Sequence, residues 1–325
     1  ARRPASAVAE NLHAGDDVRY QHIKRQRGVA VVTAMLLTTL AITIVATLFW
    51  QQQVQVRSID NQRLQLQKQW VLRGALDWAR LILREDSKYS AIDDLTEPWA
   101  VPLSETRLDR YVESAALRGE ATTAVLSGAI QDAQARLNLS ALASHGEINL
   151  AEVAAFEKLL GFLRQDPGLA RAAAQAIAQS QRHADAGSGS PRMITLIQVD
   201  DLLAVPGFTP LVLNAIRNHI IFLPRATPVN ANTATAEVLA ARLPQLSLAD
   251  ANHLITYRRS VSFRDLPEIS ARLPGKPDMD PALLSVASSY FLVNGRVAIR
   301  QAGLQVQGLV ERSGAATHLL WMNQT

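Results

Sequence analysis

The side chains that most often carry enzyme chemistry are few and scattered in this sequence. The chain has seven histidines and no cysteine, so no thiol nucleophile or cysteine-type zinc site can form. The histidines lack metal-ligand spacing, and no phosphate loop or nucleophile elbow is present. The Gly-Ser run at 187–190 is not followed by a helix with lysine, so we interpret it as a flexible linker. These features predict no catalytic residues and no cofactor.

Two pairs of acidic residues are the remaining candidates for binding a cation. They are Asp200 with Asp201 and Asp278 with Asp280. Calcium needs about six to eight oxygen ligands, several of which are usually carboxylates. A helix N-terminus or a solvated turn explains each pair more simply. The sequence therefore predicts no metal site.

A basic stretch directly before an apolar run is the strongest signal in the chain. Residues 19–27 include several basic side chains and no acidic one, and residues 29–56 are uncharged. As a helix, 29–50 would extend about 33 Å, close to the ~30 Å hydrocarbon core of a bilayer. The positive flank predicts a cytoplasmic N-terminus, with the chain after about residue 51 on the far side, in the periplasm of a Gram-negative bacterium. A secretory signal would have a shorter apolar run, whereas a plain anchor fits the hydropathy equally well.

Other elements must follow this segment, because the chain is long enough for one large or two modest domains and is 48% hydrophobic. Helical spacing continues to about residue 84, and Trp70 and Trp78 are predicted to be core residues of this helix. Residues 93–102 are predicted to form a loop that buries Trp99, and 120–131 a strand with a bulge or bend at Gly128.

The rest of the chain changes from helical to β character. Helix is predicted from about 139 to 181, a linker at 183–191, further helices, and then strands from 288 to 324. These strands are separated at Asn294-Gly295 and at Ser313-Gly314, and the first of these dipeptides is a strong hairpin signal. The predicted fold class is α+β: a long N-terminal helix on a small antiparallel sheet, with a large helical domain inserted within the sheet. The charge of +4 does not by itself predict nucleic-acid binding.

The residues at the start of the apolar run resemble the prepilin peptidase site of type IV pilins and pseudopilins. The sequence KRQRG at 24–28 ends in glycine directly before the helix. The resemblance implies cleavage after Gly28 and N-methylation of Val29. Most pilins carry glutamate at the fifth mature position, where this chain has Thr33. The missing glutamate resembles the K-type minor pseudopilin of type II secretion and fits a first or tip subunit.

Further short motifs resemble the K-type pseudopilin in the same order along the chain. They are RGVA at 27–30, LRED at 83–86, DLTEPWA at 94–100, RLNL at 136–139, PVNANTA at 228–234, AEVLAA at 236–241 and SYF at 289–291. The resemblance implies a structural subunit, not an enzyme, that caps the pseudopilus with the I-type and J-type minor pseudopilins for the export of folded proteins. It also implies the prepilin peptidase and the inner-membrane secretion platform as partners. The family's acidic calcium loop corresponds to 177–191, which contains a single carboxylate, Asp185, so no calcium site is expected.

The resemblance divides the chain into five segments. They are a basic prepilin leader at 1–28, a transmembrane segment at 29–56, the first part of a pilin-like domain at 57–140, an inserted helical SAM-like domain at 141–286, and C-terminal pilin-like strands at 287–325.

One alternative function comes from 229–266, which also resembles a helix-hairpin-helix DNA-binding element. It would make the chain a membrane-anchored DNA-uptake protein, with Arg258 and Arg259 near the phosphates. Such a hairpin needs glycines whose backbone N–H groups meet phosphate. The hairpin position here is PQLS at 244–247, without glycine, which favours a structural role for these helices.

Overall fold

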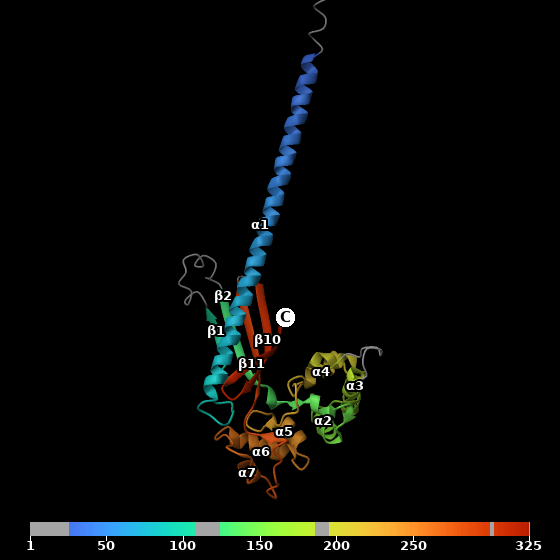
Figure 1. Cartoon of the computed structure of the whole chain (residues 1–325), viewed down its shortest axis with the longest axis vertical. Helices are drawn as coiled ribbons and strands as arrows, with labels where there is room; N and C mark the ends of the chain where they lie inside the picture. Colours follow the sequence, from blue (N-terminus) through green and yellow to red (C-terminus); the bar gives the residue numbers. More distant parts are fainter. Residues whose placement is uncertain (1–25, 108–123, 186–194, 300–301, 325) are drawn as a thin grey trace, which may run out of the picture. The chain divides into compact units, whose positions relative to one another are not determined.

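The computed structural model describes residues 26–107, 124–185, 195–299 and 302–324, and the chain forms two compact units, Ala1–Leu66 and Gln67–Thr325. Helix α1 (Gln26–Asp86) begins in the first unit and ends in the second (Figure 1). It confirms the predicted long helix with slightly wider limits. Its segment Gly28–Ile59 is long and apolar enough to cross a membrane, and no other described helix is.

The second unit contains a five-stranded antiparallel sheet in the order β1-β2-β9-β10-β11 (Figure 1). Its strands are β1 (Leu103–Arg107), β2 (Ala124–Asp132), β9 (Tyr290–Ile299), β10 (Ala302–Ser313) and β11 (Ala316–Gln324). Strands β2 and β9 pair directly although 133–289 lie between them in sequence. The long helical segment is therefore inserted between two paired strands.

The last turns of α1 pack on one face of this sheet. Leu72, Leu76, Ala79 and Leu83 are buried at the helical spacing of one face. Burial of each leucine side chain contributes about 1.5–3 kcal/mol to the free energy of unfolding. The other face of the sheet is partly covered at one end, where Leu292 packs with residues of the inserted segment and the rest remains open.

Glycines of the sheet permit close approach of neighbouring groups. A Cβ atom on Gly128 would lie 2.8 Å from the backbone oxygen of Asn294, closer than a real contact allows. A Cβ on Gly295 would lie 3.2 Å from Val306 Cγ1 of β10, and a Cβ on Gly308 would lie 3.3 Å from Leu76 Cδ2 of α1. Small residues at these positions therefore let the helix and the strands pack together.

The inserted segment is mainly helical. Its longer elements are α2 (Leu150–Phe162), α3 (Gly168–Asp185), α4 (Pro210–Ile216), α5 (Ala236–Arg242), α6 (Leu248–Arg258) and α7 (Leu266–Ser270). Short strands join distant parts of it: β3 (Leu137–Asn138) with β6 (Ile220–Ile221), β4 (Ala143–Ser144) with β5 (Glu147–Ile148), and β7 (Val229–Asn230) with β8 (Leu284–Ser285). The 3-10 helices are η1 (Pro98–Ala100), η4 (Ala133–Ala135), η5 (Leu139–Leu142) and η6 (Val199–Ala204). These elements enclose a continuous core that includes Phe156, Leu239 and Phe263.

Two predicted turns and bends differ from the structure. Strand β9 runs through Asn294 and Gly295, so the predicted hairpin there is wrong, because both residues pair with β2 on one side and with β10 on the other. The irregular register near Gly128 lies between Leu103 and Thr106, so the extra residue is on β1 rather than at the glycine. The turn after β10 is confirmed, with Gly314 at a φ of 57°.

Two further predictions about helices are wrong. Trp70 and Trp78 are 72% and 50% exposed, because they lie on a different face of α1 from its buried leucines. The predicted helix from 139 begins instead at Leu150, after η5 and the β4–β5 hairpin. Helix α3 extends to Asp185, into the predicted linker, and residues 186–191 of that linker lie outside the described part of the chain. Trp99 is buried as predicted.

Candidate functional site

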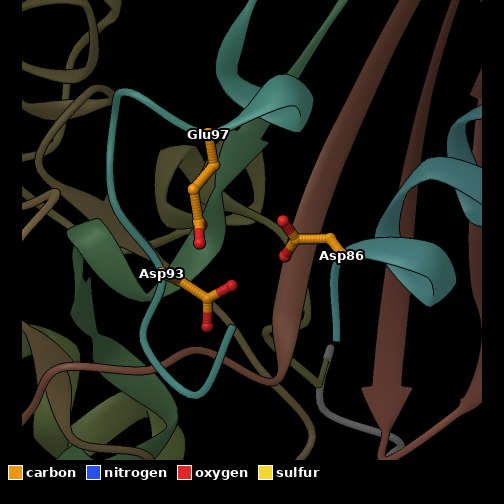
Figure 2. A group of neighbouring side chains, drawn as sticks. All are labelled: Asp86, Asp93 and Glu97. Atoms are coloured by element: carbon orange, nitrogen blue, oxygen red, sulfur yellow. The ribbon is translucent and has the colours of Figure 1, made fainter. Parts of the chain in front are cut away.

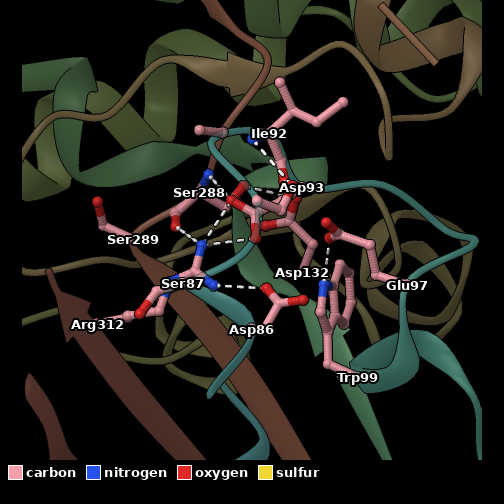
Figure 3. Close-up of polar contacts among 12 residues, drawn as sticks. Asp86, Ser87, Ile92, Asp93, Glu97, Trp99, Asp132, Ser288, Ser289 and Arg312 are labelled. Carbon is pink, nitrogen blue, oxygen red and sulfur yellow. Dashed lines mark hydrogen bonds and ion pairs between the residues drawn. The ribbon is translucent and has the colours of Figure 1, made fainter. Parts of the chain in front are cut away.

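Several of the sequence motifs meet in one place, where the sheet joins the inserted segment. LRED ends at Asp86, DLTEPWA follows Asp93, and PVNANTA contains Asn230 and Thr233. These side chains belong to a largely buried polar cluster that we call the junction network, and Figure 3 shows its part around Asp86, Asp93 and Arg312. Its members are Asp86, Asp93, Asp132, Asn230, Thr233, Ser288 and Arg312.

Arg312, in β10, is the cation of the junction network. Its guanidinium donates to Asp86 Oδ2 at 3.0 Å and to both carboxylate oxygens of Asp93 at 2.5 and 2.6 Å. It also donates to the carbonyl oxygen of Ser288 at 3.0 Å. The side chains of Arg312, Asp86 and Asp93 are 9%, 7% and 1% exposed. This ion pair ties the end of α1 and the following loop to the sheet, away from screening solvent.

Asp132, at the end of β2, is the fully buried acid of the junction network. Its Oδ2 accepts hydrogen bonds from Asn230 Nδ2 at 2.9 Å, Ser288 Oγ at 2.6 Å and Thr233 Oγ1 at 2.5 Å. Its Oδ1 accepts from the backbone N–H of Gln134 at 2.7 Å. Burial raises the pKa of Asp132 to about 6, although the hydrogen bonds from Ser288, Thr233 and Gln134 oppose the shift. The carboxyl group of Asp132 therefore links the end of β2 to Asn230 and Thr233 in the inserted segment, and to Ser288 just before β9.

The carboxylates of Asp86, Asp93 and Glu97 point toward one another, with oxygens within 4.8 Å (Figure 2). Burial, followed by the negative charges of Glu97 and Asp93, raises the pKa of Asp86 to about 6. Burial also raises the pKa of Asp93, against the opposing effect of Arg312. Glu97 Oε2 accepts from Trp99 Nε1 at 2.7 Å. Because Arg312 already provides a cation to two of these acids, the cluster is explained by protein contacts.

Asn230 connects the junction network to the rest of the inserted segment. Its Nδ2 donates to the carbonyl oxygen of Asp93 at 3.1 Å, and its Oδ1 accepts from the N–H of Asn232 at 2.9 Å. Asn232 in turn exchanges two hydrogen bonds of 2.9 Å with the backbone of Phe263. The PVNANTA motif therefore provides asparagines that satisfy buried backbone groups. The arrangement can fix the geometry of the junction, and it presents no activated nucleophile.

The residues predicted for processing lie in the first unit and not at the junction. Gly28, Val29 and Thr33 are exposed positions of α1. The hydroxyl of Thr33 donates to the carbonyl oxygens of Val29 and Ala30, both at 3.0 Å. A threonine of this kind satisfies its hydroxyl within its own helix. Cleavage after Gly28 and methylation of Val29 stay predictions.

The predicted acidic pairs have local partners. Asp201 accepts from the backbone N–H groups of Ile197 and Gln198 at 2.9 and 2.8 Å, and Asp200 pairs with Arg217 at 2.9 Å. Asp280 Oδ1 accepts from a backbone N–H at 2.8 Å. The contacts of Asp201 and Asp280 are those of a helix start and a turn, whereas the exposed pair of Asp200 with Arg217 joins η6 to the end of α4.

Of the two arginines at the end of α6, Arg259 is exposed, whereas Arg258 is used in a contact within the protein. Arg258 donates to the carbonyl oxygen of Ala231 at 2.5 Å. Burial, together with the charge of Arg259, lowers the pKa of Arg258 to about 10. This arginine is therefore used inside the protein and is not free to meet a phosphate.

Comparisons with known proteins agree on one family. The sequence profile described as "Type II secretion system (T2SS), protein K" matches residues 229–287. Type II secretion system protein K of Pseudomonas aeruginosa is 24% identical over 282 residues, or 76% of this chain and 77% of that protein. The structure is similar to a chain in the crystal structure of the GspK-GspI-GspJ complex from the type 2 secretion system of enterotoxigenic Escherichia coli. The TM-score is 0.63 at 20% identity, covering 83% of this chain and 99% of that chain, which supports the α+β pilin-like fold.

Sequence reasoning missed most of the junction network. Asp132, Ser288 and Arg312 belong to no motif that was singled out, and their partners are far away in sequence. A buried arginine in a strand was the one available signal, since an arginine among apolar strand residues needs an acidic partner.

Proposed function

We propose that this chain is a type II secretion minor pseudopilin of the K type, and that it forms the tip of the pseudopilus as a structural, non-enzymatic subunit. Its apolar helix segment Gly28–Ile59, the one such segment among the described helices, anchors it in the bacterial inner membrane. The N-terminus is cytoplasmic and the second unit is periplasmic, which follows from the cations before residue 28. Prepilin peptidase cleaves after Gly28, and Val29 becomes the methylated first residue.

The observation that carries the assembly role is an apolar surface on α1. Trp70 and Trp78 are 72% and 50% exposed, and Leu81 is 42% exposed. Beside Trp78 lies an apolar groove of about 330 Å³ between α1, the sheet and the loop that holds Pro98 and Val101. Exposed tryptophans beside an apolar groove are typical of a protein interface, where such residues contribute most of the binding energy.

The partners are proposed from the chemistry of this surface and from the similar structure. A GspK chain was solved together with GspI and GspJ, so the I-type and J-type minor pseudopilins are the proposed occupants of the surface. The absence of a glutamate at Thr33 supports a tip position, because the uncharged helix start has no carboxylate to pair with the N-terminus of another subunit. The secretion platform of the inner membrane is the proposed site of assembly.

Co-purification of the full chain with its I-type and J-type partners tests the interface. We expect Trp70→Ala combined with Trp78→Ala to lower the recovered partners at least about tenfold, since each exposed anchor contributes on the order of 2 kcal/mol. Leu211→Ala is the matched control, because Leu211 is 81% exposed but lies in α4. Equal recovery with the tryptophan variant and the control contradicts the proposed interface.

Mass spectrometry of the protein purified from membranes tests the processing. The expected N-terminal peptide begins at methylated Val29. An intact leader, or an N-terminus at another residue, contradicts cleavage after Gly28 and leaves α1 as a plain membrane anchor.

A further inference from the structure

The open face of the sheet forms one wall of a polar cleft in the second unit. The cleft has a volume of about 730 Å³ and is closed on the other side by the segment that contains η6, α4 and β6. It contains none of the junction-network residues, and it shares Gly128, Asn294 and Gly295 with the lining of the apolar groove beside Trp78. Neither the membrane anchor nor the proposed assembly role uses it.

Amide side chains form a row across this wall. Asn294, Gln307 and Asn323 are direct cross-strand partners in β9, β10 and β11, and all three line the cleft. Neighbouring members of the row are therefore about 4.8 Å apart. Asn294 Oδ1 accepts from Gln307 Nε2 at 2.9 Å, which holds two of the amides in place. Each amide still offers donors and acceptors toward the cleft.

Rows on either side of the amides add a cation and an apolar surface. Arg296 and Gln305 are cross-strand partners in the next row, and Arg296 is exposed without an ion pair to any described residue. On the other side, Leu292 and Trp321 provide apolar surface at the base of the cleft. The wall therefore runs from apolar through neutral polar to cationic.

The charges that line the cleft favour an acidic or neutral ligand. Arg136, Arg217 and Arg296 lie among the described lining residues, with Asp200 as the acid. Asp200 is already paired with Arg217 at 2.9 Å, and Arg136 donates to Gln131 at 2.8 Å. Arg296 is thus the cation that can pair with an anionic group of a ligand.

The central strands of this wall cannot pair with the backbone of a peptide. The central strands β9 and β10 are paired on both sides, so their N–H and C=O groups are used within the sheet. A ligand in the cleft therefore has to be recognised by side chains. It must form hydrogen bonds with several of them, in several directions. The neighbouring hydroxyls of a sugar ring both donate and accept, and its C–H face suits an indole.

We propose that this cleft binds an acidic oligosaccharide. The amides of Asn294, Gln307 and Asn323 would meet the ring hydroxyls, Arg296 a carboxylate, and Trp321 the apolar face of one ring. The proposal does not depend on the tip function, so the two can fail separately.

Isothermal titration of the full chain in detergent micelles tests the proposal with three hexamers. Hexagalacturonate is expected to bind saturably and more tightly than neutral maltohexaose, while hexaglutamate does not bind. Arg296→Gln is expected to weaken hexagalacturonate about tenfold, since one charge-assisted hydrogen bond is lost, and to leave maltohexaose unchanged. Asn323→Ala is expected to lower the affinity for both sugars about fivefold.

Arg264→Gln is the control, because this arginine is 80% exposed and does not line the cleft. Near-UV circular dichroism of each variant verifies its fold. Absence of saturable sugar binding overturns the proposal, as does sugar binding that is unchanged in Arg296→Gln and Asn323→Ala. Hexaglutamate binding as tight as that of hexagalacturonate overturns it in favour of a polypeptide ligand.

Discussion

Replacing Arg312 by methionine removes the cation from the junction network and leaves its acids in place. Breaking a buried ion pair by removing one partner costs about 3–5 kcal/mol, because the remaining charge is buried without compensation. Arg312 is 9% exposed and donates to Asp86 and Asp93. We therefore expect Arg312→Met to lower the free energy of unfolding by about 3–5 kcal/mol at pH 7.5.

The pH dependence of this loss of unfolding free energy follows from the pKa values of the acidic side chains. The pKa of Asp86 is raised from 3.8 to about 6, so the folded protein binds this proton more tightly than the unfolded chain. The resulting stabilisation is complete below about pH 4 and is lost as the pH rises through about 6. Removing Arg312 raises the pKa of Asp86 further, so this carboxyl group is protonated at pH 5 and is not left as an unpaired charge. The loss of unfolding free energy caused by Arg312→Met should therefore be smaller at pH 5 than at pH 7.5.

Urea unfolding of the full chain in detergent micelles, followed by near-UV circular dichroism, measures both quantities. Arg217→Met is the control, because its pair with Asp200 is 45% and 64% exposed and should contribute less than about 1 kcal/mol. A loss for Arg312→Met no larger than that of the control refutes the reasoning. A loss that is equal at pH 5 and pH 7.5 refutes its electrostatic part.

Further predictions concern Asp132 and two glycines. Burial raises the pKa of Asp132 from 3.8 to about 6, so the wild type should lose up to about 3 kcal/mol of stability as the pH rises from 4 to 7, and urea unfolding should show a flatter profile for Asp132→Asn. An unchanged slope contradicts this prediction. Gly128→Ala should destabilise by about 1–3 kcal/mol in thermal unfolding, because its Cβ meets the Asn294 oxygen. Gly161→Ala, in α2 with open space around it, should stabilise by about 0.5–1 kcal/mol, and equal shifts for both glycine variants contradict the packing argument.

Elements that depend only on residues close in sequence can be predicted from local sequence patterns. The uncharged run after Gly28 predicted α1, since length and hydropathy alone define such a helix. The turn after β10 was also predictable, because Ser313-Gly314 supplies the glycine that a positive φ favours. Trp99 was predicted as buried, since two prolines fix the loop around it.

Features that depend on distant parts of the chain could not be predicted in this way. Asn294-Gly295 has the local signature of a hairpin, but both residues pair with β2 and β10, and a Cβ on Gly295 would lie 3.2 Å from Val306 Cγ1. Trp70 and Trp78 share the helical spacing of core residues, and only the position of the sheet decides which face of α1 is buried. Arg312 and Asp86 meet through pairing across the whole chain, for which no local spacing exists.

The pairing of β2 with β9 has a consequence for the order of folding. Residues 133–289 must be made before β9 exists, so β2 is without this neighbour during most of synthesis. Contacts at such sequence separation form slowly, because the closure of the intervening loop costs conformational entropy. The inserted segment has its own core and can shorten the loop by folding first. We therefore expect the sheet to be completed last, after the C-terminal strands have been synthesised, and truncation before β9 to leave β1 and β2 open to aggregation.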